Sequence, residues 1–558
     1  MKKVISILLA VVLVLSFMLP AFSWVNIDET QSQIPVIRIS GDGEALYDAE
    51  GNKIFHYNDL TKLFSSNNTE EGGTDNSELY KSMAETLLPA LAKGLALNSW
   101  DDLYEGLETE IGKIFANSLL DKDGNVPNGS GLSEARKLEM EDKRHNDRKG
   151  AKGYYSWIDY WFYYDWRLDP MESADLFHEY IQDLKASTGC EKVGVTATCL
   201  GTNVFLAYVS KYGVGDIQGV GIDGSVAGGA EILSEVICAK FDIAPPALMR
   251  ILKDVEGLGM FSIDDFIMET IDMLVQTGLL EGVISTTENI FYDKLVEGVT
   301  SALALSTFYT WPNYWACVSP EDYEDAKYYV FGEEGSEKRK EYAGLIAKLD
   351  NYDREVRQRI PELLKAIKDG GANLGIISKY GYQIIPICAS ADKIGDQFAS
   401  VERSSFGATT SSVYETLSDD YIAKRVAEGK GKYISPDKQI DASTCLFPDL
   451  TWFIKGSSHS NWTTYELKML YDICSSDRQL TFDDFPYSQF MVYNTEEDLL
   501  FPMTEENCNT EFWDADPDVY TPKTIFDKIR VAINSFVRWF KLFIEFIQEN
   551  ANSGEVQQ

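Results

Sequence analysis

The sequence predicts an α/β protein whose core is a mostly parallel sheet flanked by helices. Along residues 172–224, a helical repeat of apolar residues precedes the strand-like KVGVTA, and a second helical segment precedes the strand-like IQGVGIDG. Strand–helix–strand alternation of this kind is typical of parallel strands joined by crossover helices. With 44% hydrophobic residues, the chain also has enough apolar surface to bury a core. Further strand-like runs lie at 34–40, 155–170, 382–390 and 450–456.

The first 23 residues are expected to be a secretory signal peptide. Lys2 and Lys3 precede the apolar run VISILLAVVLVLSFML, and small residues follow at Ala21 and Ser23. A charged start, an apolar stretch and small residues at the cleavage site are the features of such a leader. An uncleaved membrane anchor is the alternative. We therefore expect the mature protein to be secreted or otherwise extracytoplasmic.

The charge and the cysteines exclude two classes of ligand. The chain has 88 acidic and 50 basic residues, and its formal charge is -38. Such a chain is repelled by phosphates, so we expect no nucleic-acid partner. The eight cysteines include no CxxC pair and no Cys/His spacing typical of a metal site. We therefore expect neither a metal nor a cofactor, and the pairing of the cysteines stays open.

Four parts follow the leader. Residues 24–225 and 371–521 are expected to form the two parts of the sheet-containing core. Residues 226–370 contain helical patterns without strands of any length, which predicts a helical insertion between the two parts. The last part, residues 522–558, differs from the rest in charge and is expected to be a helix with a tail.

The stretch VTATCLGT (195–202) has the pattern of a turn that presents a nucleophile. An apolar strand runs into Cys199, and a helical pattern follows. In such a turn the residues two before and two after the nucleophile crowd each other, and here they are the small Ala197 and Gly201. The N–H of Leu200 would face a developing oxyanion, and the helix N-terminus would favour a thiolate. A buried structural cysteine is the alternative.

This turn and three other stretches resemble secreted α/β-hydrolases of the lecithin:cholesterol acyltransferase-like and lipase-like group. The family's elbow usually has the sequence Gly-His-Ser-Met-Gly, whereas this chain has Ala-Thr-Cys-Leu-Gly. The resemblance implies an α/β-hydrolase fold with a large helical cap, and esterase, lipase-like or acyltransferase-like activity on carboxylic esters of lipidic type. The matching stretches are YDWRLDPMESADLFHEYI (164–181), TGCEKVGVTATCLGTNVFLAYVSKYG (188–213), SSFGAT (404–409) and TWFIKGSSHSNW (451–462).

A nucleophilic cysteine needs a base, and histidine is the usual choice. The hydrolase order along the chain is nucleophile, acid, base, so the base should follow Cys199. His459 does so, in the loop GSSHSNW after the strand-like LTWFIKG, and is the expected base; a solvated loop histidine is the alternative. The chain's other histidines are His56, His145 and His178.

The acid is expected in the loop after the strand-like YQIIPICAS at 382–390. In the family this loop commonly contains Ser-Asp-Gly and leads into a Ser-x-Gly-Ala-Thr segment. Counting back from SSFGAT assigns the family's aspartate to Asp396, although Gln397 replaces the usual glycine. Asp392, directly after the strand-like run, is the second candidate.

The second oxyanion donor is expected in the turn SGDGEALY (40–47). Gly41 and Gly43 allow the backbone to approach a tetrahedral intermediate closely, with the N–H of Asp42 or Gly43 as the donor. An ordinary glycine turn is the alternative.

Two segments bear on the substrate and on partners. The apolar helices of the insertion predict either a lid over an acyl-binding cleft or ordinary core packing. Residues 523–548 form a basic amphipathic pattern, which predicts binding to a membrane surface or to a partner, or docking on the protein's own body. The main hypothesis is an esterase with the triad Cys199, His459 and Asp396. The alternative is a catalytically silent protein of the same fold that binds an acyl or other hydrophobic ligand.

Overall fold

The computed structural model describes most of the chain between residues 31 and 508. The expected signal peptide, residues 241–288 of the insertion and the tail segment 523–548 lie outside the described residues. The described ranges are 31–41, 43–56, parts of 86–100, 101–145, 155–156, 160–240, 289–385, 388–413, 415–459, 461, 463–483, 487–494 and 499–508.

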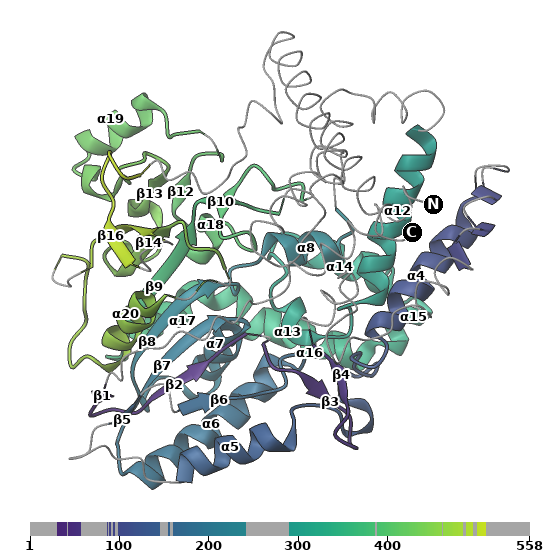
Figure 1. The fold of residues 1–558 in the computed structure, drawn as a ribbon, viewed down its shortest axis with the longest axis horizontal. Helices are drawn as coiled ribbons and strands as arrows, with labels where there is room; N and C mark the ends of the chain where they lie inside the picture. The colour runs from purple at the N-terminus through teal and green to yellow at the C-terminus, as the bar shows by residue number, and fades with distance from the viewer. Residues whose placement is uncertain are drawn as a thin grey trace, which may run out of the picture.

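An eight-stranded sheet forms the centre of the described structure (Figure 1). All neighbouring pairs are parallel except the pair at one edge, where the last strand is antiparallel. The predicted α/β fold with a mostly parallel sheet is therefore confirmed. In spatial order the strands are β16 (Leu499–Pro502), β15 (Phe490–Asn494), β14 (Thr451–Lys455), β9 (Asn373–Tyr380), β8 (Ile217–Ser225), β7 (Val193–Cys199), β2 (Val36–Ile39) and β6 (Tyr160–Phe162).

Helices cover both faces of this sheet, so its strands are almost entirely buried, apart from the edge strand β16. On one face, alternate apolar residues of the strands pack with α6 (Pro170–Thr188), α7 (Leu200–Tyr212) and α17 (Ile360–Asp369). On the other face the remaining residues pack against α20 (Thr464–Ser475). Burial on both faces explains why the strands have continuous apolar patterns rather than alternating ones.

Local signals in the sequence fix the ends of α6. The Asp169 carboxylate accepts the N–H of Met171 at 2.9 Å, and Pro170 occupies the first turn, where its missing N–H costs nothing. The helix ends at Gly189, whose φ of 73° is readily adopted by glycine.

The order of the strands creates a switch in the direction of the connections at the carboxyl end of the sheet. From β2 the chain moves to its neighbour β6 on one side, whereas from β7 it moves through β8, β9 and β14 on the other side. The connections that leave β2 and β7 therefore diverge. In open α/β sheets, ligand sites lie in the crevice at such a switch in direction. Cys199 is the last residue of β7 and therefore lies at this switch in direction.

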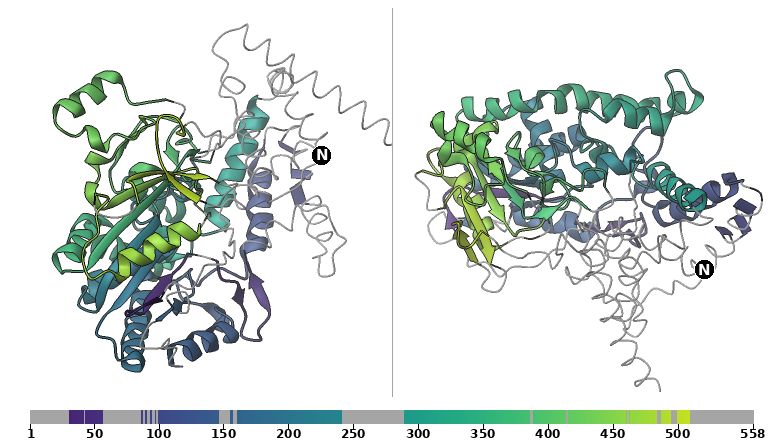
Figure 2. Two further views of the ribbon diagram at one scale, coloured as in Figure 1. Left: turned by 60° about the vertical axis from the view of Figure 1, so that its left-hand side comes forward. Right: turned by 90° about the horizontal axis from the view of Figure 1, so that it is seen from above.

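Between β8 and β9 the described residues contain helices and no strand, as the sequence predicts. The helix α12 packs alongside α4, and this pair stands on the side of the molecule away from β16 (Figures 1 and 2). The helices α16 and α17 pack on α7 of the core. The helices named here that lie between β8 and β9 are α8 (Glu231–Ile237), α12 (Asn289–Ser306), α13 (Pro312–Trp315), α14 (Tyr323–Phe331), α15 (Glu337–Glu341) and α16 (Ala343–Glu355). The helix α4 (Asp101–Phe115) comes before them in the chain.

One strand prediction is wrong. The sheet strand before the acid loop is β9, and the predicted run 382–390 contributes only β10, a short pairing with β11 outside the main sheet. Gly381, with φ of 109°, ends β9, and the polar residues Ser378 and Lys379 mask its pattern in the sequence. The strands β15 and β16 also extend the sheet beyond what the sequence predicts.

Short elements complete the described structure. They are β1 (Gln31–Ser32), β3 (Leu46–Tyr47), β4 (Lys53–Phe55), β5 (Tyr155–Ser156), β10 (Tyr382–Gln383), β11 (Ile394–Gly395), β12 (Thr409–Thr410), β13 (Ile440–Asp441), α5 (Glu134–His145), α18 (Val401–Ser404) and α19 (Asp419–Ala427). Within the described part of the chain, no helix has the length and apolar character needed to cross a membrane.

Candidate active site

Cys199 lies at a sharp strand-to-helix turn with a strained backbone. Its φ is 50° and its ψ is -129°, a conformation that residues other than glycine rarely adopt. The turn needs the small residue that follows: a Cβ on Gly201 would lie 2.4 Å from the carbonyl oxygen of Ile39 in β2. The thiol therefore stands at the N-terminus of α7, half-buried, where the sequence predicts a nucleophile.

The glycine turn after β2 lies directly beside this thiol. A Cβ on Gly41 would lie 3.1 Å from Sγ of Cys199 and 3.7 Å from the backbone nitrogen of Leu200. A residue outside the turn helps to hold it in place, because the Tyr164 hydroxyl donates to the Ser40 carbonyl at 2.9 Å. The backbone of Gly41 is therefore close to two groups of the strand-to-helix turn, the Cys199 thiol and the Leu200 N–H.

Two residues of this turn are predicted to supply an oxyanion donor, and the structure describes only one of them. Asp42 lies outside the described residues. Gly43 is described, and its carbonyl lies 3.3 Å from Nε2 of His56. The indole of Trp166 also donates to the Glu44 carbonyl at 2.9 Å, which adds a second fixed point to the turn. Of this turn, Gly41 lies beside the thiol, and the donation of an oxyanion hydrogen bond by the N–H of Asp42 or Gly43 stays a prediction.

The structure brings His459 and Asp396 together. Nδ1 of His459 lies 2.7 Å from Oδ2 of Asp396, and the backbone N–H of His459 donates to the Asp396 carbonyl at 2.9 Å. The two side chains are 6% and 0% exposed, and the ring of Phe398 stacks on the imidazole at 4.8 Å. Asp392, the second candidate for the acid, is exposed at the surface. Asp396 is therefore the partner of His459.

The environment of Asp396 favours its charged form. Burial raises the pKa of this carboxyl, but the charge and hydrogen bond of His459 and two backbone donors lower it by more. These donors are the N–H groups of Phe398 and Ala399, at 3.1 and 2.9 Å from Oδ1. The net effect is a pKa below the usual value, so the carboxylate stays charged and can orient the imidazole through Nδ1.

This depressed pKa predicts how stability depends on pH. A carboxyl with a lower pKa in the folded state contributes stability above its unfolded pKa of about 4, and this contribution is lost as the pH falls through the folded value. We therefore expect Asp396→Asn to unfold at a lower temperature than the wild type near pH 7, with the difference shrinking below about pH 4. Thermal unfolding followed by circular dichroism between pH 3 and 7 measures it. A difference that stays constant over this range contradicts the prediction.

The imidazole of His459 lies over the end of β8, the neighbour of β7. A Cβ on Gly224 would lie 3.5 Å from Cε1 and Nδ1 of His459, and the next residue, Ser225, pairs with Cys199 across the two strands. The other ring nitrogen, Nε2, is buried and has no hydrogen-bond partner among the residues that the structure describes. It is therefore available to exchange a proton with a group at the crevice.

The other histidines serve elsewhere. His178 lies on α6 and stacks on Tyr212 with ring centroids 3.9 Å apart. His56 is beside the carbonyl of Gly43, and the side chain of His145 lies outside the described residues. Of the three side chains that are described, only that of His459 has a carboxylate partner in the acid loop.

Six of the remaining seven cysteines are buried, whereas Cys190 is half-buried like Cys199 but lies at the opposite end of β7. The eight cysteines are present as thiols. Burial raises the pKa of Cys238 to about 12 and that of Cys445 to about 11, and it raises the pKa of Cys388 and Cys474 as well. Such thiols are poor nucleophiles at neutral pH, because the thiolate is the reactive form. Cys199 is therefore the cysteine best placed to react.

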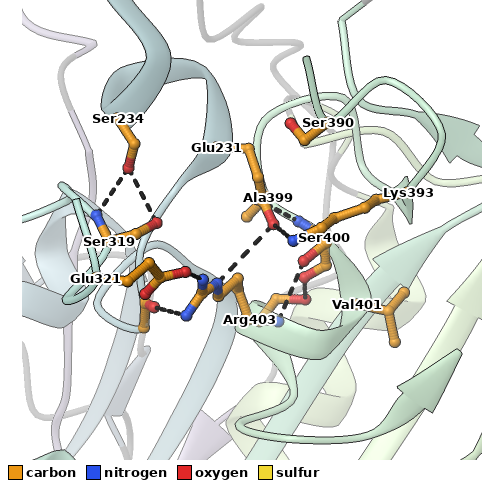
Figure 3. Close-up of polar contacts among 12 residues, drawn as sticks. Glu231, Ser234, Ser319, Glu321, Ser390, Lys393, Ala399, Ser400, Val401 and Arg403 are labelled. Carbon is orange, nitrogen blue, oxygen red and sulfur yellow. Dashed lines mark hydrogen bonds and ion pairs between the residues drawn. The ribbon is translucent and has the colours of Figure 1, made fainter. Parts of the chain in front are cut away.

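Two buried glutamates on α8 hold the acid loop, and sequence reasoning missed both. Glu235 accepts the N–H groups of Ala389 and Ser390 at 2.5 and 3.1 Å, at the start of the loop. Glu231 accepts the N–H of Ser400 at 2.9 Å, just after Asp396 (Figure 3). The signal in the sequence is a pair of glutamates four residues apart in an otherwise apolar helix.

Arg403 completes this support from the other side of Glu231. Its guanidinium lies 3.9 Å from Glu231 and also pairs with Glu321 (Figure 3). Lys393 reaches the same carboxylate at 3.4 Å. The negative charge of Glu231 is thus balanced by two cations, which makes its burial at the loop tolerable. The first helix after β8 is therefore tied to the loop that carries Asp396.

The described residues include no group of three or more His, Cys, Asp or Glu side chains arranged to hold a metal ion. Comparison of the chain with protein-family models and with curated proteins found no match.

Proposed function

We propose that this protein is a secreted esterase or acyltransferase with an α/β-hydrolase fold, in which Cys199, His459 and Asp396 act on carboxylic esters of lipidic type. The observation that carries the proposal is the buried hydrogen bond of 2.7 Å between His459 and Asp396, with Nε2 of the same imidazole left without a partner among the described residues. A base held in this way is what a nucleophile at the neighbouring strand end requires.

The topology supports the hydrolase fold. The nucleophile follows β7, the acid lies in the segment after β9, and the base follows β14, so the chain order is nucleophile, acid, base. This is the order of α/β-hydrolases, in which the nucleophile also stands on a strained turn between a strand and a helix. The strained φ of Cys199 and the close contact of Gly201 with β2 are consistent with that turn.

In the first half of the proposed reaction, Nε2 of His459 takes the proton of the Cys199 thiol. The sulfur attacks the ester carbonyl, and the negative charge that develops on oxygen is stabilised by the Leu200 N–H and the 41–43 backbone. The carbon–oxygen bond to the leaving group then breaks. The imidazolium, whose charge Asp396 stabilises, returns its proton to the departing alcohol, and an acyl thioester remains on Cys199.

In the second half, water or an acceptor alcohol enters the crevice. His459 removes its proton, the oxygen attacks the thioester carbonyl, and the carbon–sulfur bond breaks. The proton then returns to the sulfur, which restores the thiol. Water as the acceptor gives hydrolysis, and an alcohol gives acyl transfer. A lipidic substrate is supported by the family resemblance and by the apolar helices of the insertion.

Trapping the acyl thioester tests this proposal. The mature protein is mixed with p-nitrophenyl esters of two to twelve carbons, quenched in acid and measured by intact-mass and peptide mass spectrometry. We expect one acyl group on the peptide that contains Cys199, released by neutral hydroxylamine and absent from His459→Ala. The absence of acylation, or acylation spread evenly over several cysteines, contradicts the proposal and favours a silent ligand-binding protein.

A further inference from the structure

A lysine is buried in the middle of the sheet, close to the candidate site. Lys379 lies in β9 and its side chain is fully buried, a position that lysine almost never takes unless it is paired. Its ammonium group lies 3.0 Å from Oδ2 of Asp223 and 3.7 Å from Oε1 of Glu466, and both carboxylates are buried. Three charged groups from β8, β9 and α20 therefore meet in the interior.

This cluster is attached to both ends of the loop that carries His459. The ammonium group of Lys379 donates to the carbonyl of Asn461 at 2.7 Å, two residues after the histidine. Glu466 accepts the hydroxyl of Ser457 at 3.0 Å, two residues before it, and the N–H of Thr463 at 2.8 Å. Lys379 and Glu466 therefore hold the loop on both sides of His459, through the Ser457 hydroxyl before it and the backbone of Asn461 and Thr463 after it.

The third member of the cluster, Asp223, is next in sequence to a residue close to the imidazole. Asp223 precedes Gly224, the residue over which the ring of His459 lies. Burial lowers the pKa of Lys379, but Asp223 and Glu466 raise it by more, so the ammonium stays charged. Asp396 contributes to the same effect, which indicates that the cluster and the His459–Asp396 pair interact electrostatically.

We infer that Lys379, Asp223 and Glu466 are positioning residues, which hold the histidine loop so that the imidazole of His459 stays in line with Asp396 and with the thiol. The inference rests on the proposed function for its effect on rate, whereas its effect on the imidazole can be measured without any substrate. Burying a cluster of charged groups carries a desolvation penalty, and apolar side chains of the same volume often stabilise a fold more. We attribute the presence of charged groups at this place to their hydrogen bonds with the histidine loop.

A second lysine of the sheet, which is partly buried, provides a control. Lys455 lies in β14, in register with Tyr380, the neighbour of Lys379, and its ammonium group lies 2.9 Å from the Asp437 carboxylate. It also reaches the side-chain oxygen of Gln439 at 3.2 Å, so its bonds lead away from the histidine loop. Lys455→Met therefore removes a partly buried ion pair at the same end of the sheet.

The experiment compares Lys379→Met with Lys455→Met in two measurements. The first is the NMR signal of the imidazole proton on Nδ1 of His459, in protein labelled with ¹⁵N-histidine and assigned with His459→Ala. The second is ester hydrolysis, with kcat and KM separated. For Lys379→Met we expect the proton signal to shift or vanish and kcat to fall by about a hundredfold, with KM nearly unchanged. For Lys455→Met we expect both measurements to match the wild type.

Each outcome has a defined meaning. If the wild type hydrolyses no ester, the proposed function fails, but the NMR comparison still tests the positioning role. If the signal and kcat respond equally to the two lysine variants, the positioning role is refuted. If Lys379→Met does not fold, Glu466→Gln replaces it, because a glutamine can accept only one of the two bonds from Ser457 and Thr463. An unchanged His459 signal in that variant also refutes the inference.

Discussion

Cys199→Ala is expected to lower kcat/KM for p-nitrophenyl ester hydrolysis on the order of 10⁴-fold or more. The sulfur is the group that we propose to form the acyl intermediate, so its loss would leave only the oxyanion donors and substrate binding. Cys199→Ser keeps an attacking group at the same strained position and is expected to retain more activity than the alanine variant. Initial rates of p-nitrophenol release over a range of ester lengths measure both effects.

Cys190→Ala is the matched control for this experiment. Cys190 is also half-buried and lies just before β7, but at the opposite end of that strand from Cys199. Its replacement is expected to leave the rate unchanged. Equal rates for the wild type, the two Cys199 variants and the control would mean that the hydrolysis does not use this thiol, and the esterase hypothesis would fail.

Gly201→Ala is expected to lower the free energy of unfolding by about 3 kcal/mol, near the upper end of the usual cost of overpacking. The added Cβ would lie 2.4 Å from the Ile39 carbonyl oxygen and 2.8 Å from its carbon. Both are backbone atoms of a central strand, so relief requires α7 to move away from β2. That movement would also displace the Leu200 N–H and the thiol. Urea unfolding monitored by tryptophan fluorescence measures the loss.

Gly215→Ala is the control for this stability prediction. A Cβ on Gly215 would meet no atom within 4 Å, and this residue does not have a positive φ. The substitution is therefore expected to leave the urea midpoint almost unchanged or to raise it slightly, because alanine reduces the freedom of the unfolded chain. If both alanine variants unfold at the wild-type midpoint, the close packing of α7 on β2 is not as described.

The parts of the site that depend on local chemistry could be predicted from the sequence. The turn at Cys199 requires small residues at fixed spacing, and Ala197 and Gly201 satisfy that requirement in the sequence itself. His459 could be found because histidines are scarce and only one stands in a loop after a late strand. Asp396 was chosen over Asp392 by the spacing to SSFGAT, and its burial beside His459 agrees with that choice.

The parts that depend on distant contacts could not be predicted in this way. The strand β9 was missed because Ser378 and Lys379 interrupt its apolar pattern, and these residues are buried only because other elements supply their partners. Glu231 has its partners in the acid loop, more than 150 residues further along the chain. No window of sequence contains both members of such a pair. The sheet order and the supports of the site therefore come from the structure alone.

The assembly of the site from widely separated strands has a consequence for folding. β2 pairs with β7 from Val36 to Gly194, and the base arrives only with β14, so the contacts between these parts of the site close long loops. Contacts between residues far apart in the sequence form slowly. During synthesis the N-terminal part of the chain appears first, so the Cys199 segment is exposed well before His459 has been added. We therefore expect a nascent chain, or one truncated before His459, to carry the Cys199 thiol without its base. The reactivity of Cys199 would then mark the completion of folding.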